Sequence, residues 1–391
     1  MIFPPRVSRI PLSTAKNGQR LTLKKTISRS GLMKSRTGLR LVINSESNAY
    51  YGESAYLPNS TPDQPAQSAY NFEDLRLAWG HTQAVVPDSI LDEPTPAEMR
   101  FWEKFRQEKQ ERTNSGAYVP APFEGVNLHQ KYDQECMRFA QLPAYSKFWI
   151  YINLGGKWIF LIFTPFYALI SLAMHVASKS SYTKVDFLEA FIGGSYFISL
   201  PFLLCWIIGH IVINHFPRIW FRPPKGPLWE LNRRTGLVTI FGYKRHRKEG
   251  VIDEFIAPFY EFDAYMTTTN NRHGPTYGLL LQHRYEDRKI NFHTLINADD
   301  FQQRPCALWD FLQNYMDTSG PIPDIPLLEP YRHLDPVTAR YDQQRGRNPR
   351  YWIDMDDATF KTEVDAMWQR VYAIDTFSRP NLMARYVDYG L

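Results

Sequence analysis

The sequence predicts an α+β membrane protein, in which a two-helix transmembrane hairpin is followed by an antiparallel β meander that a helix closes, after a partly ordered N-terminal region. Three observations predict this class. Two long runs near the middle of the chain carry almost no charge. Apolar and polar residues then alternate, as they do in half-buried strands, and a helix with one apolar side follows them.

The first apolar run is KWIFLIFTPFYALISLAMHVA, residues 157–177, which carries a charge only at its first position. Twenty helical residues at about 1.5 Å each span roughly the 30 Å hydrocarbon layer of a bilayer. The second run, AFIGGSYFISLPFLLCWIIGHIVI, residues 190–213, follows after the polar connection SKSSYTKVDFLE. We therefore predict a two-span hairpin over residues 147–216. A buried helical hairpin in a soluble domain is the alternative, and the length of the runs argues against it.

The basic residues that flank the spans predict the orientation, because lysine and arginine tend to stay on the cytoplasmic side. The loop between the spans carries Lys179 and Lys184 beside Asp186 and Glu189. The outer flanks are more basic, with Lys131, Arg138 and Lys147 before the first span and Arg218, Arg222, Lys225, Arg233 and Arg234 after the second. We expect both termini in the cytoplasm and the protein in a bacterial inner membrane.

We predict that residues 1–94 form a basic arm and a weakly ordered linker. The first 45 residues contain no Asp or Glu and are rich in Ser, Lys and Arg. Such a start is also typical of a mitochondrial transit peptide, which makes a mitochondrial membrane the alternative location. Otherwise the arm is a flexible segment that anionic lipid or nucleic acid attracts without specificity.

We predict that residues 95–146 form a helical region that precedes the transmembrane hairpin in the sequence. Thr95 can cap a helix, Pro96 suits its first position, and Glu98 completes a capping box, so a helix is expected over residues 96–112. Its apolar stripe is short.

The β-rich cytoplasmic domain is expected over residues 217–320. PLWELNRRTGLVTIFGY predicts one β-hairpin, and EFIAPFYEFDAYMTTT with TYGLLLQHRYED predicts another around NNRHGP. RKINFHTLI adds a strand, and PCALWDFLQNYMD predicts a closing helix with Leu308, Phe311, Leu312 and Tyr315 on one side. We expect residues 226–320 to fold alone, and the tail, residues 321–391 with one amphipathic helix, to matter less.

This order of elements resembles the pleckstrin-homology-like domains of bacterial membrane proteins. The paired spans, the exit FRPPKGPLWELNRRTGLV and the helix around Trp309 carry the resemblance. The arrangement is also similar to an uncharacterised family of two-span bacterial proteins associated with type VI secretion and toxin loci. The resemblance covers roughly residues 70–330 and implies an architecture and a role as an accessory or immunity factor.

No motif for catalysis or for a cofactor occurs in the chain. GxSxG, P-loop and GxGxxG patterns are absent, so we predict neither an enzyme nor a cofactor. Metal candidates are His283 with His293 and the acidic cluster Asp354, Asp356 and Asp357, without an HExxH or DxDxDG framework. Packing histidines and a helix N-terminus explain these residues as well, so no metal is predicted. Cys136, Cys205 and Cys306 form no disulfide framework, which fits a reducing compartment.

The basic loop YKRHRKEG is the sharpest candidate contact site. Lys244, Arg245, Arg247 and Lys248 are predicted to contact anionic lipid or an acidic partner, the alternative being a solvated loop.

We predict a noncatalytic two-pass protein that presents its β domain to an unidentified protein partner, either a secretion component or a toxin, and that can oligomerise. The alternative function is a membrane enzyme or a small transporter or channel component that uses Cys205 and His210 in the second span.

Overall fold

The computed structural model describes residues 50–62, 66–67, 74–80, 94–120, 126–177, 184–242, 250–272, 274–292 and 301–389. The chain forms two compact units. Of the described residues, those within Ala140–Lys225 belong to the helical unit, and those within 50–118, His129–Phe139 and Gly226–Leu391 belong to the α+β unit. The predicted combination of α-helices with antiparallel sheets is confirmed.

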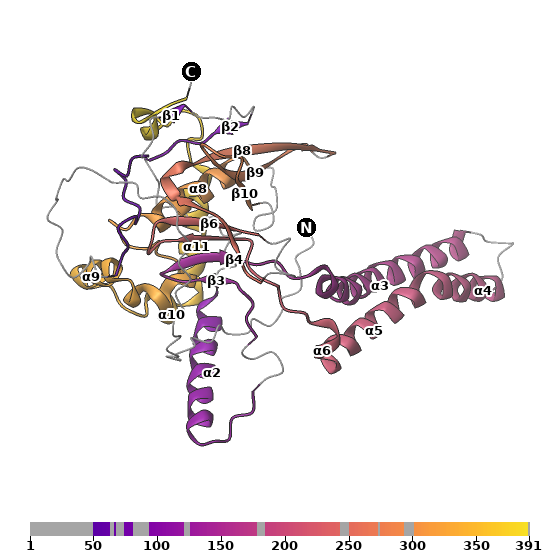
Figure 1. Ribbon diagram of the computed structural model, residues 1–391. Helices are drawn as coiled ribbons and strands as arrows, with labels where there is room; N and C mark the ends of the chain where they lie inside the picture. The colour runs from indigo at the N-terminus through magenta and orange to yellow at the C-terminus, as the bar shows by residue number, and fades with distance from the viewer. Residues whose placement is uncertain are drawn as a thin grey trace. The chain divides into compact units, whose positions relative to one another are not determined.

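Two antiparallel sheets form the α+β unit (Figure 1). The larger sheet is a meander of five strands in chain order: β3 (Lys131–Tyr132), β4 (Cys136–Phe139), β5 (Trp229–Asn232), β6 (Leu237–Phe241) and β7 (Asp253–Pro258). The smaller sheet has the order β10-β9-β8-β2, with β2 (Leu75–Arg76), β8 (Phe262–Asn271), β9 (Gly274–His283) and β10 (Lys289–Asn291). A short parallel pair joins β1 (Ala66–Gln67) to β11 (Val387–Asp388).

Both predicted hairpins are present, as β5–β6 and β8–β9. The turn that joins β5 to β6 depends on Gly236, which adopts a positive φ of 71° and whose N–H donates to the Asn232 carbonyl at 2.8 Å. The stretch EFIAPFYEFDAYMTTT is not one strand. Pro258 lacks an N–H donor, and the 3₁₀ turn η2 (Phe259–Glu261) after it carries the chain from one sheet to the other.

The two helices predicted in the α+β unit, one before the first apolar run and one after the strands, are confirmed. α2 (Pro96–Asn114) begins with the predicted capping box of Thr95 and Glu98. α8 (Gln303–Met316) buries its predicted apolar side. It also buries Asp310 and Gln313. α8 is therefore a central helix that other elements cover on nearly every side, and not a closing helix with one solvent-exposed face.

Segments far apart in the sequence share one aromatic core in the α+β unit. The ring of Trp79 lies 4.6 Å from that of Trp309 and 5.3 Å from that of Phe259, and Tyr56 lies 5.2 Å from Phe259. Trp79 is only 1% exposed. Part of the predicted linker, residues 46–94, is therefore core, because its few apolar residues find long-range partners that no local periodicity announces.

The C-terminal tail also belongs to this core, although we expected it to matter less. Its helical elements are η4 (Pro326–Leu334), α9 (Pro336–Arg345), α10 (Tyr351–Asp354), α11 (Asp357–Tyr372) and η5 (Leu382–Arg385). Trp352, Val371, Met383 and Tyr389 are buried. Segments on either side of residues 226–320 thus supply core side chains.

Buried Asp263 on β8 ties four segments together. Its carboxylate accepts hydrogen bonds from Arg284 at 2.7 and 3.0 Å, from Trp79 Nε1 at 3.0 Å and from the Tyr389 hydroxyl at 3.0 Å. Burial, then the Asp263 charge, raises the pKa of Tyr389 well above its usual value, so this hydroxyl keeps its proton and remains a donor.

A second buried ion pair joins Arg233, in the β5–β6 turn, to Asp335, the N-cap of α9. Both side chains are fully buried. The Arg233 guanidinium also donates to the carbonyls of Tyr315 and Asp317 at 2.5 Å each and of Gly320 at 2.7 Å. The Asp335 carboxylate also accepts from the Tyr51 hydroxyl at 2.5 Å and from the Thr338 N–H at 3.0 Å. The pair holds the tail against the larger sheet.

Two cysteines of the α+β unit are expected to resist alkylation. Burial raises the pKa of the Cys136 thiol to about 12 and that of Cys306 to about 11, so almost no thiolate forms at pH 7.5. In detergent, a C205A variant should take up no maleimide until denaturant exposes both thiols, as mass spectrometry of the intact protein would show. Modification of either thiol before unfolding would contradict the burial described here.

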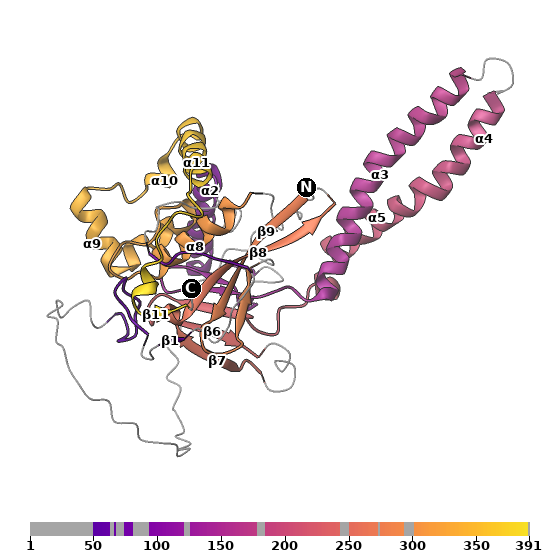
Figure 2. The ribbon, with the colours of Figure 1, turned by 90° about the horizontal axis from the view of Figure 1, so that it is seen from above.

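The helical unit consists of α3 (Ala144–Ala177), α4 (Lys184–Gly194), the π-helical turn η1 (Ser195–Ser199), α5 (Leu200–His215) and α6 (Pro217–Trp220). α3 runs beside α4 and α5 in the opposite direction (Figure 2). Lys184–Glu189, expected to be loop, are helical. The π turn lies just before Pro201, whose ring would clash with the carbonyl four residues earlier in a regular α-helix.

The helical unit is an insertion within a β-hairpin of the α+β unit. β4 and β5 pair antiparallel, with Phe139 opposite Trp229, and the Leu228 N–H donates to the Phe139 carbonyl at 2.8 Å. Ala140–Lys225 separate these two strands in the sequence. The chain therefore leaves the sheet and returns to it at neighbouring points.

Candidate functional site

The predicted contact residues Lys244, Arg245, Arg247 and Lys248 lie outside the described residues, as does His293. The structure therefore leaves the basic loop as a sequence prediction.

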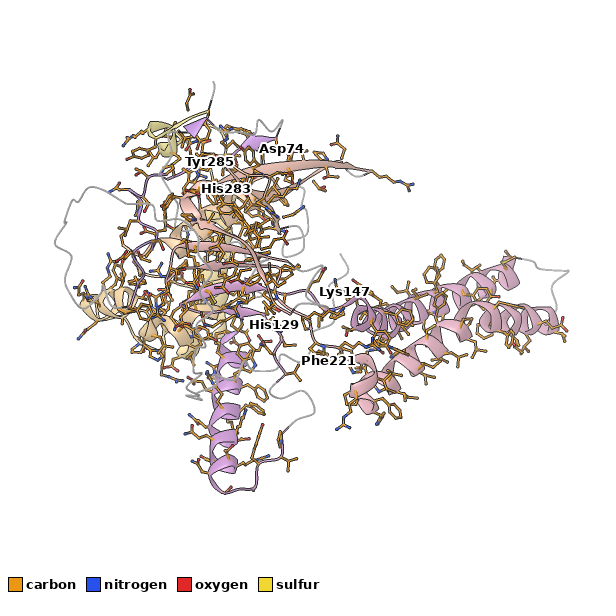
Figure 3. All side chains as sticks on the ribbon, viewed as in Figure 1. Asp74, His129, Lys147, Phe221, His283 and Tyr285 are labelled. Carbon is orange, nitrogen blue, oxygen red and sulfur yellow. The ribbon has the colours of Figure 1, made fainter. Side chains whose placement is uncertain are left out.

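His283 is a packing residue of the α+β unit. Its Nε2 lies 3.1 Å from a carboxylate oxygen of Glu261, and its Nδ1 accepts the N–H of Glu286 at 3.0 Å, so both ring nitrogens have protein partners. The rings of Phe255 and Phe262 pack edge-on against it at 4.8 and 5.1 Å. Figure 3 labels His283 and the neighbouring Tyr285. Neither nitrogen faces an open coordination position.

The acidic cluster at residues 354–357 organises helix ends. Asp356 caps α11 and accepts the N–H groups of Ala358 and Thr359 at 3.1 and 2.9 Å. The Thr359 hydroxyl, which also donates to it, lowers the pKa of this carboxyl. Asp354 instead pairs with Arg350 at 3.0 Å. No group of three or more His, Cys, Asp or Glu side chains arranged for a metal occurs among the residues that the structure describes.

His210 and Cys205 do not form a polar track through the helical unit. The Asn214 amide lies 3.1 Å from His210 Nδ1 and donates to the His210 carbonyl at 2.9 Å, a contact within one helix. Cys205 lies on the face of α5 near Gly156 of α3.

A hollow of about 150 Å³ lies beside Tyr56, Trp79 and Gln313 in the α+β unit. The Gln313 amide oxygen accepts the Gly80 N–H at 2.8 Å. None of the predicted site residues lines this hollow.

The interior of the helical pair contains small and polar side chains in a regular antiparallel register, together with the aromatic pairs Phe160–Trp206 and Tyr167–Phe191. Along α3 and back along α5 and α4, Asn153 faces Gly209, Gly156 faces Cys205, Thr164 faces Ser199 and Tyr167 faces Gly194. The Thr164 and Ser199 hydroxyls hydrogen-bond at 3.0 Å. A Cβ added at Gly209 would lie 2.7 Å from Asn153 Cα, and one at Gly156 would lie 2.7 Å from the Trp206 nitrogen. The two backbones therefore approach closely, as in membrane helix pairs.

The outward side of the same pair is made of large apolar side chains. Ile162 is 59% exposed, Leu169 64% and Phe197 78%, whereas Ser171 and Ser199 on the interior are 7% and 6% exposed. Further exposed apolar residues are Phe163, Phe166, Leu172, Met174, Val176, Ile192, Leu204, Ile207, Ile208 and Ile211. A helix pair in water has the opposite pattern, because its apolar side chains pack inward.

Among the described residues, one helical stretch, Ala144–Met174, is long and apolar enough by itself to cross a membrane. Only 6% of its most apolar part is buried, unlike a core helix of a soluble domain. α5 is equally apolar but has 16 residues, and it continues the helical path of α4 and η1.

Gly209→Leu is expected to separate the helices, because the new side chain would collide with the Asn153 backbone. Cysteines at Thr164 and Ser199, in a chain without other cysteines, should form a disulfide readily with Gly209 present and much more slowly in the variant. Gly155→Leu is the matched control, since a Cβ there meets nothing within 4 Å. Equal rates in both variants would contradict close packing at Gly209.

In the sequence, Gly193 and Gly194 indicate that another helix can approach closely, and Gly194 does face Tyr167; the other interface residues were not predicted. On α3, Asn153, Gly156 and Thr164 are three and eight positions apart, and none of these pairs forms a GxxxG motif.

Comparison of the chain with protein-family models, with curated proteins and with solved structures finds no match. Its function therefore has to be inferred from its own residues.

Proposed function

We propose that this chain is a noncatalytic two-pass membrane protein, whose helical unit anchors the α+β unit and whose α+β unit binds another protein. The inside-out composition of the helical unit carries the proposal. Small and polar side chains line its interior beside two aromatic pairs, and large apolar side chains cover its outside. Lipid tails are a favourable environment for such a surface, whereas water is not.

The insertion within a β-hairpin supports two crossings rather than one. Phe139 and Trp229 are paired neighbours, so the inserted segment has to return to the side from which it left. A segment that crosses a membrane and returns does so an even number of times. The α4–η1–α5 path supplies the second crossing beside α3.

The uncharged length of α3 fits a bilayer. Residues 159–176 of α3 have no charged side chain and, at 1.5 Å per residue, span about 27 Å. By the register of Gly156 with Cys205 and Tyr167 with Gly194, this length faces roughly residues 185–202, which include Asp186 and Glu189. The length without Asp, Glu, Lys or Arg on both sides is therefore residues 158–171 opposite 190–203, about 21 Å. The hydrocarbon layer is about 30 Å thick.

The α+β unit supports a role in binding rather than catalysis through the arrangement of its buried ionisable groups. Arg233 with Asp335, Arg284 with Asp263 and His283 with Glu261 each hold chain segments together. Strands β4 to β10 in two antiparallel sheets followed by α8 are similar to a pleckstrin-homology-like arrangement, which we propose as the fold. An accessory or immunity factor of a type VI secretion or toxin system in a bacterial inner membrane remains the role that this resemblance implies.

Alkaline extraction of membranes tests the anchor. The full chain should stay in the pellet after carbonate washing. A variant in which a short Gly-Ser linker replaces Ala140–Lys225, joining Phe139 to Gly226, should be released as soluble protein. Loss of the full chain from the pellet would overturn the proposal.

Cysteine labelling tests the orientation, in which both termini are cytoplasmic. Ser180→Cys, in a chain with Cys205→Ala, should react with an impermeant maleimide added to intact cells. The two remaining cysteines, Cys136 and Cys306, are buried and should not react with the maleimide. Labelling of Ser180→Cys only after lysis would reverse the proposed orientation.

A further inference from the structure

The end of the helical unit at which the chain enters and leaves is basic and lacks acids. No Asp or Glu occurs between Glu135 and Asp186 or between Glu189 and Glu230. In the sequence between the two apolar runs, Asp186 and Glu189 accompany Lys179 and Lys184. The basic collar, as we call the cations of the entry and exit end, consists of Lys147, Lys157, Arg218, Arg222 and Lys225.

Arg222 is held in place at the centre of the basic collar. Its guanidinium carbon lies 4.0 Å from the ring centroid of Tyr145. Its backbone N–H donates to the hydroxyl of fully buried Ser146 at 2.9 Å, and that hydroxyl lies 3.2 Å from the Arg222 carbonyl. These bonds join the exit of the unit to the beginning of α3. Figure 3 accordingly shows Lys147 and Phe221 at the same end of the helical pair.

The cations of the basic collar have no acidic partner among the described residues of the chain. A guanidinium stacked on a ring still presents N–H donors at its edge, in a geometry that matches phosphate oxygens. Lys157 lies 6.0 Å from the Trp206 ring. An anionic ligand would supply the missing counter-charge.

Exposed aromatic side chains accompany these cations. Phe148, Tyr151 and Trp158 on α3 are each more than half exposed. The facing of Asn153 with Gly209 places Phe148 and Tyr151 at the level of the last turns of α5, where Phe216 is half exposed, whereas Trp158 lies nearer the beginning of α5. Aromatic rings mixed with lysine and arginine are typical of the headgroup level of a bilayer.

We propose that the basic collar binds the phosphate groups of anionic phospholipids, with Arg222 as its main contact. The inference rests on the proposed membrane anchor. A lipid satisfies both features of this surface, because its phosphate pairs with the cations while its acyl chains cover the neighbouring apolar side chains. Free phosphate would satisfy only the charges.

Tryptophan quenching in bilayers tests the proposal on the full chain. Trp149, Trp158, Trp206 and Trp220 belong to the helical unit, so quenching by dibrominated lipid reports lipid contact. We expect dibrominated phosphatidylglycerol to quench more than dibrominated phosphatidylcholine, with an association-constant ratio that R222Q lowers about fivefold. R218Q/R222Q/K225Q should bring the ratio close to one. Added salt should also reduce it.

Two variants with the same loss of charge serve as controls. R345Q removes an exposed arginine that lies 4.6 Å from the Tyr341 ring in the α+β unit, which matches the Arg222–Tyr145 pair. R340Q/R345Q/K361Q matches the triple variant in total charge. Both should keep the native ratio. An equal fall in the controls would mean that net charge, not the basic collar, sets the preference, and would overturn the inference.

The remaining outcomes separate this inference from the membrane anchor. Equal quenching of the native chain by both lipids would leave the anchor standing and reject the lipid site. Quenching by neither lipid would reject the anchor itself. Loss of the preference on adding millimolar inorganic phosphate at constant ionic strength would identify a free-phosphate site and overturn the assignment to lipid.

Discussion

Replacing Asp335 with alanine is expected to lower the free energy of unfolding of the α+β unit by about 3–5 kcal/mol. The change leaves the fully buried Arg233 guanidinium without its carboxylate and removes the N-cap of α9. It also leaves the Tyr51 hydroxyl without its acceptor. Denaturant unfolding of the detergent-solubilised chain, followed by tryptophan fluorescence, measures the loss.

Asp354→Ala is the control for this prediction. Asp354 pairs with Arg350 at 3.0 Å, close to the 3.4 Å between Arg233 and Asp335, but both side chains of the Asp354–Arg350 pair are nearly half exposed. Such surface pairs contribute about 0–1 kcal/mol. Adding Arg233→Met to Asp335→Ala should destabilise less than the sum of the two single changes, because the stranded charge is gone. Equal effects of Asp335→Ala and Asp354→Ala would contradict the role assigned to burial.

The second large effect concerns the fragment Gly226–Gly320, which should fail to fold. This reverses the expectation from the sequence. The fragment lacks β4, the hydrogen-bonded neighbour of β5, and lacks Trp79 from the aromatic core. It also lacks Asp335 and Tyr389, the partners of Arg233 and Asp263. Circular dichroism and rapid proteolysis should show an unfolded chain.

The matched comparison is residues 50–391 with Ala140–Lys225 replaced by a short Gly-Ser linker. This chain keeps every strand of both sheets and the whole tail. It should give a cooperative thermal transition and resist proteolysis. A folded Gly226–Gly320 fragment would show that the distant segments are accessories rather than parts of the core.

The elements that the sequence predicted well are those that local interactions determine. The capping box of Thr95 and Glu98 and the glycine turn at Gly236 depend on residues a few positions apart. α8 was found because its apolar spacing follows one helix. Such signals survive in any tertiary context.

The elements that the sequence missed depend on distant partners. Trp79 lies in the short stretch DLRLAWGH, which shows no sustained period, and becomes core only through Trp309 and Phe259. β3 and β4 are two and four residues long, and the partner of β4 lies beyond the helical unit. In the helical unit, the apolar runs predicted helices, which the structure contains, but the facing of Asn153 with Gly209 depends on how two helices meet.

The insertion of the helical unit between β4 and β5 has a consequence for biosynthesis. A ribosome that has finished β4 must still make Ala140–Lys225 before β5 emerges, a delay on the order of ten seconds. Throughout that interval β4 has an unpaired edge that can associate with other chains. Closure of the larger sheet therefore follows synthesis of the whole helical unit, and a nascent chain that stalls within that unit cannot complete the α+β unit.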